Sequence, residues 1–282
     1  MTAYLPNMPA KAVSAILDYC NYPEIFMKNQ LLITYNQHEY GCSVTWSDGD
    51  DEWENFVSDI DFLTLFFKDF WILLKHQNGL LQFLQLKIEV EIPGFCVNME
   101  KVLRSKRNQL KVKDLDLTVF DANQIMSILP YLDPAVRIKM IWIIEPKRNE
   151  RVLDLEEVVH LPQWKNAVEI EILGFTICNS IEHFQHFKKA HVNSFELITG
   201  QEVLRINERF LFSNTLKNLH FDYKTFQDDQ NLLESQLGPT ISYFNNTGVH
   251  HLWVLHGLAG LRTEICTELS SKYLNIRRRP EC

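Results

Sequence analysis

The sequence predicts an α/β protein: a leucine-rich-repeat-like β/α solenoid that follows a short N-terminal helical segment and ends in an antiparallel C-terminal cap. Three observations lead to this fold class: a recurring apolar motif, amphipathic stretches between its copies, and strand-like segments near the C-terminus. The 282 residues are 46% hydrophobic and 23% charged, which is typical of a globular chain with a sizeable core.

The apolar motif has the form L-x-x-L-x-L, and its six copies start 24 to 29 residues apart. Leucine-rich repeats have units of about 20–29 residues, each with one strand. Because one unit cannot bury its apolar face alone, the units must stack. Ordinary βα alternation could also produce six irregular copies, and this alternative stays open. The motif anchors are Phe83/Leu86/Ile88, Val112/Leu115/Leu117, Ile138/Ile141/Ile143, Ala167/Ile170/Ile172, Val192/Phe195/Leu197 and Leu216/Leu219/Phe221.

Helices are predicted between the copies and before the first one. Residues 121–132 carry apolar side chains at helical spacing. Upstream, two strands should form a hairpin that turns around Glu39–Gly41. Residues 53–76 then predict one long helix, and its inward face would hold Phe56, Ile60, Leu63, Phe67, Phe70 and Leu74.

The chain is expected to divide into consecutive parts. Residues 31–80 should hold the hairpin and the long helix, residues 81–248 the β/α repeats, and residues 249–282 the cap. The cap closes the exposed end of the repeat array, as such arrays require. Arg277–Arg279 is interpreted as a solvated basic tail. The predicted antiparallel strands of the cap are residues 250–256, 261–268 and 272–278.

The first 30 residues predict a pair of short helices. Val13, Ile16, Leu17 and Cys20 form one apolar stripe at helical spacing. Pro9 suits a first helical turn, because its missing N–H would be unpaired there in any case. From periodicity alone, these helices could simply pack on the body of the protein.

Two parts of the sequence resemble known modules of nematode proteins. "LPNMPAKAVSAILDYCNYPEI" resembles the first half of an F-box. Most of residues 31–223 resembles the FTH domain that follows the F-box in nematode F-box proteins, with "ILPYLDP" and "LEEVVHLPQWKNA" as the more specific stretches. Family members continue with a further helix that completes the box. Here Ile25–Gln30 leads directly into strand-like sequence, so about half of the box is absent.

The resemblance implies a function and a set of binding residues. Residues 1–30 would be a partial F-box that docks on a Skp-family adaptor, and residues 31–282 an FTH-type domain that captures a target protein. The chain would then be a non-enzymatic substrate receptor of a Skp–cullin–F-box ubiquitin ligase. The alternative is a protein-binding repeat module that has lost ligase docking because its box is incomplete. The adaptor-facing residues implied are Leu5, Pro6, Met8, Val13, Ile16 and Leu17.

The residues between the motif anchors should share one face of the strands, because side chains alternate along a strand. Of these eighteen positions, seven are acidic and one is lysine. An acidic face with an aromatic anchor favours a protein partner that carries a basic segment. A solvated face, with Trp142 covered by another part of the same chain, is the competing interpretation. The target-binding residues predicted are Asp114, Asp116, Met140, Trp142, Glu169, Glu171, Glu196 and Asp222.

Other function classes have weaker signals in the sequence. The net charge of −8 disfavours binding to nucleic acid or an anionic membrane. The sequence carries none of the common catalytic or nucleotide-binding motifs, so we expect no enzyme, no cofactor and no metal site. His183 and His186 stand one helical turn apart without a third ligand, and His250 and His251 should point to opposite faces of a strand. Six scattered cysteines favour the cytosol or nucleus.

Overall fold

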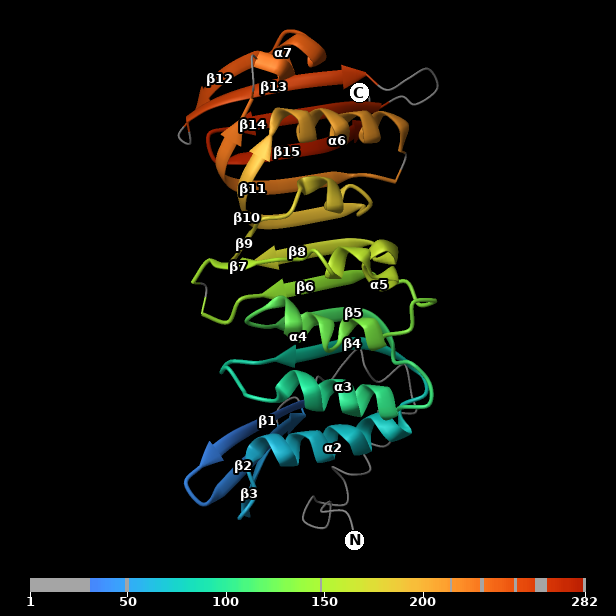
Figure 1. Cartoon of the computed structure of the whole chain (residues 1–282). Helices are drawn as coiled ribbons and strands as arrows, with labels where there is room; N and C mark the ends of the chain where they lie inside the picture. The colour runs from blue at the N-terminus through green and yellow to red at the C-terminus, as the bar shows by residue number, and fades with distance from the viewer. Residues whose placement is uncertain are drawn as a thin grey trace. The chain divides into compact units, whose positions relative to one another are not determined.

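The computed structural model describes residues 31–48, 51–147, 149–213, 215–228, 231–245, 248–256 and 263–280 (Figure 1). They form a mixed α/β structure with one three-stranded and one twelve-stranded sheet. The predicted N-terminal helices and the adaptor-facing residues lie outside this part of the chain. Among the described residues, no helix combines the length and the apolar run that crossing a bilayer demands.

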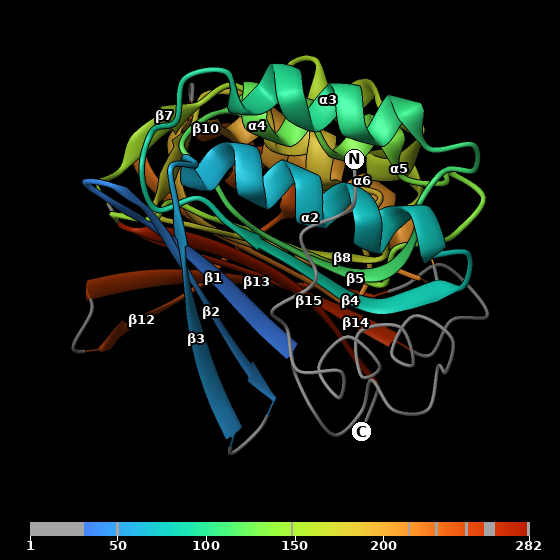
Figure 2. The same cartoon turned by 90° about the horizontal axis from the view of Figure 1, so that it is seen from below.

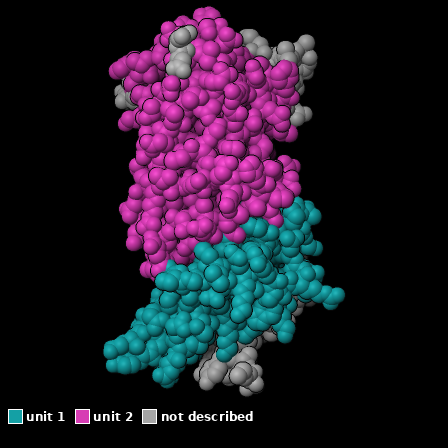
Figure 3. All heavy atoms as spheres, viewed as in Figure 1, with its two compact units in different colours: residues 1–84, 92–113, 127–136 teal, residues 85–91, 114–126, 137–282 magenta. Residues whose placement is uncertain are grey.

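The chain divides into two compact units, coloured separately in Figure 3. Each unit is described by itself below. Strands β4 (Leu80–Lys87) and β5 (Lys111–Thr118) contribute residues to both units. Of the described residues, unit 1 contains those within 1–84, 92–113 and 127–136, and unit 2 those within 85–91, 114–126 and 137–282.

Unit 1 opens with an antiparallel sheet of β1 (Leu31–His38), β2 (Gly41–Asp48) and β3 (Asp51–Ser58). The predicted hairpin at Glu39–Gly41 is confirmed. Glycine is required at its end, because Gly41 has φ +153° and a Cβ there would lie 2.1 Å from the Val57 carbonyl oxygen.

The long helix predicted for residues 53–76 is wrong in its first part. Residues 53–58 belong to β3, where pairing with β2 overrides helical spacing, and Phe56 is 53% exposed. The helix α2 (Phe62–His76) begins only after Asp61, whose carboxylate accepts a hydrogen bond from the Thr64 N–H at 2.9 Å. The other helices among the described residues of unit 1 are α3 (Phe95–Ser105) and the 3₁₀ turn η2 (Leu129–Tyr131).

The main sheet of unit 2 contains strands that lie side by side in chain order. Their order in the sheet is β4 (Leu80–Lys87), β5 (Lys111–Thr118), β6 (Met140–Ile144), β8 (Glu169–Leu173), β10 (Lys189–Thr199) and β11 (Asn218–Gln227). The pairs from β5 to β11 are parallel. Beside them, β7 (Arg151–Leu153) pairs in parallel with β9 (Phe175–Ile177).

The C-terminal strands are antiparallel; the sequence predicts the last three of them but not the first, which falls in the stretch predicted as β/α repeats. They are β12 (Ile241–Asn245), β13 (Gly248–His256), β14 (Thr263–Ser270) and β15 (Tyr273–Pro280). The last of them, β15, pairs antiparallel with β11 and so continues the sheet.

Helices α4 (Ala122–Met126), α5 (Pro162–Asn166) and α6 (Gly200–Phe212) lie on one side of the unit 2 strands, as Figure 2 shows. On that side the anchors Ile141, Ile170 and Ile172 are fully buried. The predicted helical stretch 121–132 is interrupted and contains only α4 and η2. The bounds are α4 (Ala122–Met126), η3 (Val158–His160), α5 (Pro162–Asn166), η4 (Ile181–Phe184), α6 (Gly200–Phe212) and α7 (Leu232–Leu237).

The fifth copy of the apolar motif is displaced from its predicted position. Ala190 and Val192 pair with Ile170 and Ile172, so the anchors begin five residues earlier than predicted. The register then shifts between Val192 and Phe195. As a result Leu197, predicted as an anchor, is 42% exposed, whereas Ile198 is buried.

The basic run Arg277–Arg279 is not a solvated tail. It lies in β15, where the partly buried Arg278 guanidinium reaches the C-terminal end of α6. Its Nε donates to the Leu216 carbonyl at 3.3 Å, and its Nη2 donates to the carbonyls of Phe210 and Ser213. The side chain therefore satisfies carbonyl groups that a helix end leaves unpaired.

The strand register predicts that neighbouring substitutions in β8 change the free energy of unfolding by unequal amounts. Ile172→Ala should lower the free energy of unfolding by about 2–5 kcal/mol, because it leaves a cavity in the core. Glu169→Ala should change it by roughly 0.5 kcal/mol or less, as expected of a partly exposed side chain. Urea unfolding followed by circular dichroism measures both. A larger cost for Glu169→Ala would mean that the register is wrong.

Arg278 should stabilise unit 2 through its geometry as well as its charge. Arg278→Lys keeps the charge but cannot reach three carbonyl oxygens at once, so we expect a loss of about 1.5–3 kcal/mol in the free energy of unfolding. The matched control is Arg279→Lys, since Arg279 is exposed on the same strand. Equal unfolding midpoints for the two variants would contradict the helix-capping role.

Candidate functional site

The candidate site is the face of the unit 2 sheet opposite its helices, which we call the strand face. Because the parallel strands pair in register, side chains from successive strands form cross-strand rows on it. One row contains Asp114, Met140, Glu169, Lys189, Asn218 and Arg277. The next row contains Asp116, Trp142, Glu171, His191, His220 and Asn275.

Glu171 connects the aromatic and imidazole parts of the second row. Trp142 Nε1 donates to Glu171 Oε2 at 3.1 Å. The other carboxylate oxygen, Oε1, lies 3.2 Å from His191 Nδ1. Both oxygens are thus engaged, which fixes the indole through its polar edge and leaves the ring partly exposed. A held, partly exposed Trp is the kind of side chain that anchors protein interfaces.

His220 lies between two aromatic neighbours and an acid. Its ring centroid is 5.2 Å from that of His191 and 5.3 Å from that of Tyr273. His220 Nε2 lies 3.2 Å from Asp222 Oδ1. One ligand atom from each of His191, His220 and Asp222 lies within 4.8 Å of the others, so these three could hold a metal ion together.

The β5 end of the strand face is acidic and incompletely paired. Asp116 Oδ2 accepts a hydrogen bond from Gln85 Nε2 at 2.5 Å. Within the described part of the chain, Oδ1 of both Asp114 and Asp116 is buried without a hydrogen-bond partner. A buried acceptor of this kind is costly, so these oxygens favour a hydrogen-bond donor that the described residues do not supply.

At the other end of the face, Glu268 gathers three side chains. Tyr243 and Tyr273 each donate to Glu268 Oε1 at 2.7 Å, and His250 Nδ1 lies 3.2 Å from the same oxygen. Burial alone would raise the pKa of the Glu268 carboxyl. The hydrogen bonds from the two tyrosines and the charges of His250 and Arg277 outweigh this effect of burial. The pKa of Glu268 therefore lies below its usual range. Burial, followed by the hydrogen bond to Glu268, raises the pKa of Tyr273.

The strand face contains seven of the eight residues predicted from sequence to bind a target. The eighth, Glu196, lies beyond the register shift and pairs with Lys224 Nζ at 3.3 Å. Sequence reasoning missed Lys189, His191 and Arg277 on this face. It missed the first two because the fifth motif copy was placed five residues too late, and Arg277 because β15 was not expected to extend this sheet. With these residues the face is less acidic than predicted.

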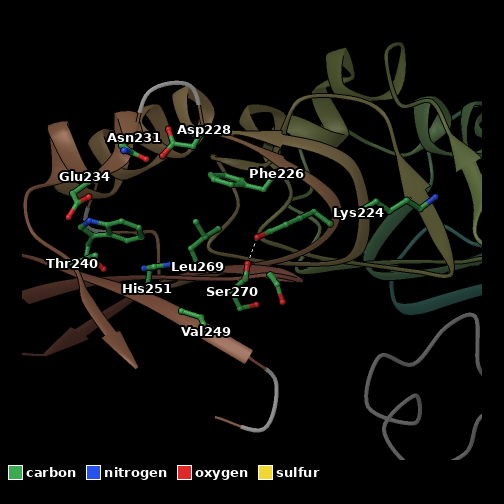
Figure 4. Close-up of a pocket in the computed structure, with 13 residues that line it drawn as sticks. Lys224, Phe226, Asp228, Asn231, Glu234, Thr240, Val249, His251, Leu269 and Ser270 are labelled. Atoms are coloured by element: carbon green, nitrogen blue, oxygen red, sulfur yellow. Dashed lines mark hydrogen bonds between the residues drawn. The ribbon is translucent and has the colours of Figure 1, made fainter. Parts of the chain in front are cut away.

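A separate cavity of about 610 Å³ lies on the helix side of the sheet (Figure 4). Asp228 and Asn231 lie on one side of it, and the strand residues His251 and Leu269 on the other. The lining of the cavity also includes Trp253, Phe226, Thr240 and Glu234.

His251 faces this cavity, whereas His250 faces Glu268 on the other side of the strand. The prediction that His250 and His251 point to opposite faces is therefore confirmed.

Comparison with known protein families matches residues 94–238 to the FTH domain. The match covers more than half of the chain, and the chain belongs to this family. F-box A protein 224 of Caenorhabditis elegans is 25% identical over 198 residues, which are 68% of this chain and 49% of that protein. The chain thus spans about half the length of this curated relative. No solved structure matches the chain.

The Glu268 cluster predicts a pH dependence of stability. Because the folded pKa of Glu268 is lowered, its contribution is complete above the unfolded pKa, about 4.3, and is lost as the pH falls through the folded value. Glu268→Gln should therefore destabilise the protein at pH 7, and the difference from wild type should shrink below about pH 4.3.

Urea unfolding from pH 7 to pH 3 measures this difference. Glu264→Gln, on the same strand, is the matched control, because it removes one carboxylate outside the Glu268 cluster. A Glu268→Gln deficit that stays constant down to pH 3 would contradict the lowered pKa.

Proposed function

We propose that this chain is a non-enzymatic protein-interaction module whose strand face captures a target protein. The observation that carries the proposal is the arrangement around Trp142, where a held aromatic side chain lies beside partly buried carboxylates. Desolvated aromatic anchors with polar surroundings provide most of the energy of protein interfaces. The FTH domain and the F-box protein relative support a protein-interaction role.

The target should present a basic or hydrogen-bond-donating segment. The unpaired oxygens of Asp114 and Asp116 favour donors, and Glu169 and Glu171 extend the acidic surface beside them. Lys189 offsets part of this charge, since its Nζ lies 3.7 Å from Glu169 Oε2. The acidic end near β5 is therefore the part of the strand face best suited to a cationic side chain of the partner.

The finer part of the proposal concerns ligase recruitment. By resemblance, Leu5, Pro6, Met8, Val13, Ile16 and Leu17 would contact a Skp-family adaptor, and the chain would act in the cytosol or nucleus as a ligase substrate receptor. The alternative is a binding module without ligase docking, because the box sequence is incomplete. In either case we propose that the consecutive parallel strands act as a leucine-rich-repeat-like solenoid that displays the strand face.

Photo-crosslinking can test which surface engages the target. A photoreactive residue at Ile144, on the strand face, should trap one protein reproducibly in extracts. The same residue at Glu208, exposed on α6, should not trap that protein. Trapping of the same protein from Glu208 alone would move the binding surface to the helices.

Binding kinetics with the trapped protein should then separate charge from anchoring. Trp142→Ala should accelerate dissociation at least tenfold, because it removes a desolvated anchor. Asp114→Asn combined with Asp116→Asn should slow association and weaken its salt dependence. The control Glu208→Lys should alter neither rate. Association and dissociation rates that are unchanged in all three variants would reject the strand face as the binding site.

Adaptor docking needs its own measurement. Because the box sequence is short, we expect weak binding of a purified Skp-family adaptor in calorimetry, weakened further by Leu5→Ala with Leu17→Ala. Tight binding that survives both substitutions would contradict the adaptor-facing assignment. No detectable binding of the wild-type chain would favour the alternative without ligase docking.

A further inference from the structure

We propose that the strand face binds a first-row divalent metal ion such as Zn²⁺ through His191, His220 and Asp222. This inference does not rest on the proposed function, because it concerns the isolated chain. The three side chains come from two neighbouring strands, so their spacing in the sequence carries no metal-binding motif. Their proximity follows from the pairing of β10 with β11.

The backbone places the three donors together. His191 and His220 are register partners in the parallel pair of β10 and β11. Asp222 follows two residues after His220, so its side chain emerges on the same face. One ligand atom of each residue lies within 4.8 Å of the other two.

The distances suit a tetrahedral ion. Zn–N and Zn–O bonds of about 2.0–2.2 Å separate two ligands of a tetrahedral site by about 3.3 Å. His220 Nε2 and Asp222 Oδ1 are already 3.2 Å apart. His191 must move closer by at most about 1.5 Å, which is within reach of a side chain that is 43% exposed. Two imidazoles and one carboxylate also leave a fourth position for water or another ligand.

The neighbouring residues orient the His191 donor. Glu171 Oε1 lies 3.2 Å from His191 Nδ1, and Trp142 holds the other oxygen of the same carboxylate. If Nδ1 carries the proton, Nε2 is left with a free lone pair for the metal. A carboxylate behind a ligating histidine is the usual supporting arrangement at metal sites.

The local charge also favours a cation. Glu171 and Asp222 bring two carboxylates to the site. The nearby lysines are engaged with other acids, Lys189 with Glu169 at 3.7 Å and Lys224 with Glu196 at 3.3 Å. Tyr273 packs against His220 without adding charge at neutral pH.

Calorimetry with Zn²⁺ on the full chelator-treated chain tests the proposal. We expect one site that His220→Ala or Asp222→Asn weakens at least tenfold. His38→Ala removes an exposed imidazole in unit 1 and should leave the affinity unchanged. Glu171→Gln, which removes a supporting carboxylate, should weaken binding by about 10–100-fold. Mg²⁺, which prefers oxygen ligands, should not compete.

Co²⁺ absorbance separates this site from the cysteines. Binding at two imidazoles and a carboxylate should give visible ligand-field bands without the thiolate charge-transfer bands of a cysteine site. Circular dichroism melts confirm that each variant is folded. The proposal is overturned if the wild-type chain does not bind Zn²⁺ or if the Co²⁺ spectrum shows thiolate bands. It is also overturned if the His220→Ala and Asp222→Asn variants are folded and keep the wild-type affinity for Zn²⁺. None of these outcomes depends on a protein partner, so the proposed function is judged separately.

Discussion

The in-register pairing of the parallel strands of unit 2 is the constraint on which the strand face depends. Each strand must place its branched apolar residues toward the helices, and this requirement fixes which side chains emerge on the opposite side. Ile170 and Ile172 are buried, so Glu169 and Glu171 must face outward. Any functional property of this face is therefore a consequence of core packing one residue away.

Much of this arrangement could be predicted from sequence because its signals are strong and local. Ile141, Ile143, Ile170 and Ile172 follow a two-residue alternation that permits only one inward face. The last three C-terminal strands were equally predictable from their apolar and turn patterns, whereas β12 was not predicted. The boundary between β3 and α2 could not be predicted, because residues 53–57 fit both a helical and a strand period. Only the pairing of these residues with β2 decides between the two.

The fifth strand shows why the candidate site was only partly predictable. Ala190 is a weak apolar signal, whereas Phe195 and Leu197 match the motif well. The chain nevertheless pairs Ala190 with Ile170, because the register shift after Val192 lets Phe195 be buried as well. This five-residue displacement brings His191 opposite His220. Such cross-strand neighbours cannot be read from spacing along one strand.

Glu171 has a consequence for how this surface can respond to its ligands. One carboxylate holds Trp142 with one oxygen and His191 with the other. Two binding events that both involve this group are thermodynamically linked, and such a linkage is reciprocal. An ion that tightens the contact to His191 would change the freedom of the Trp142 indole. A protein that immobilises the indole would change the affinity for the ion by the same factor.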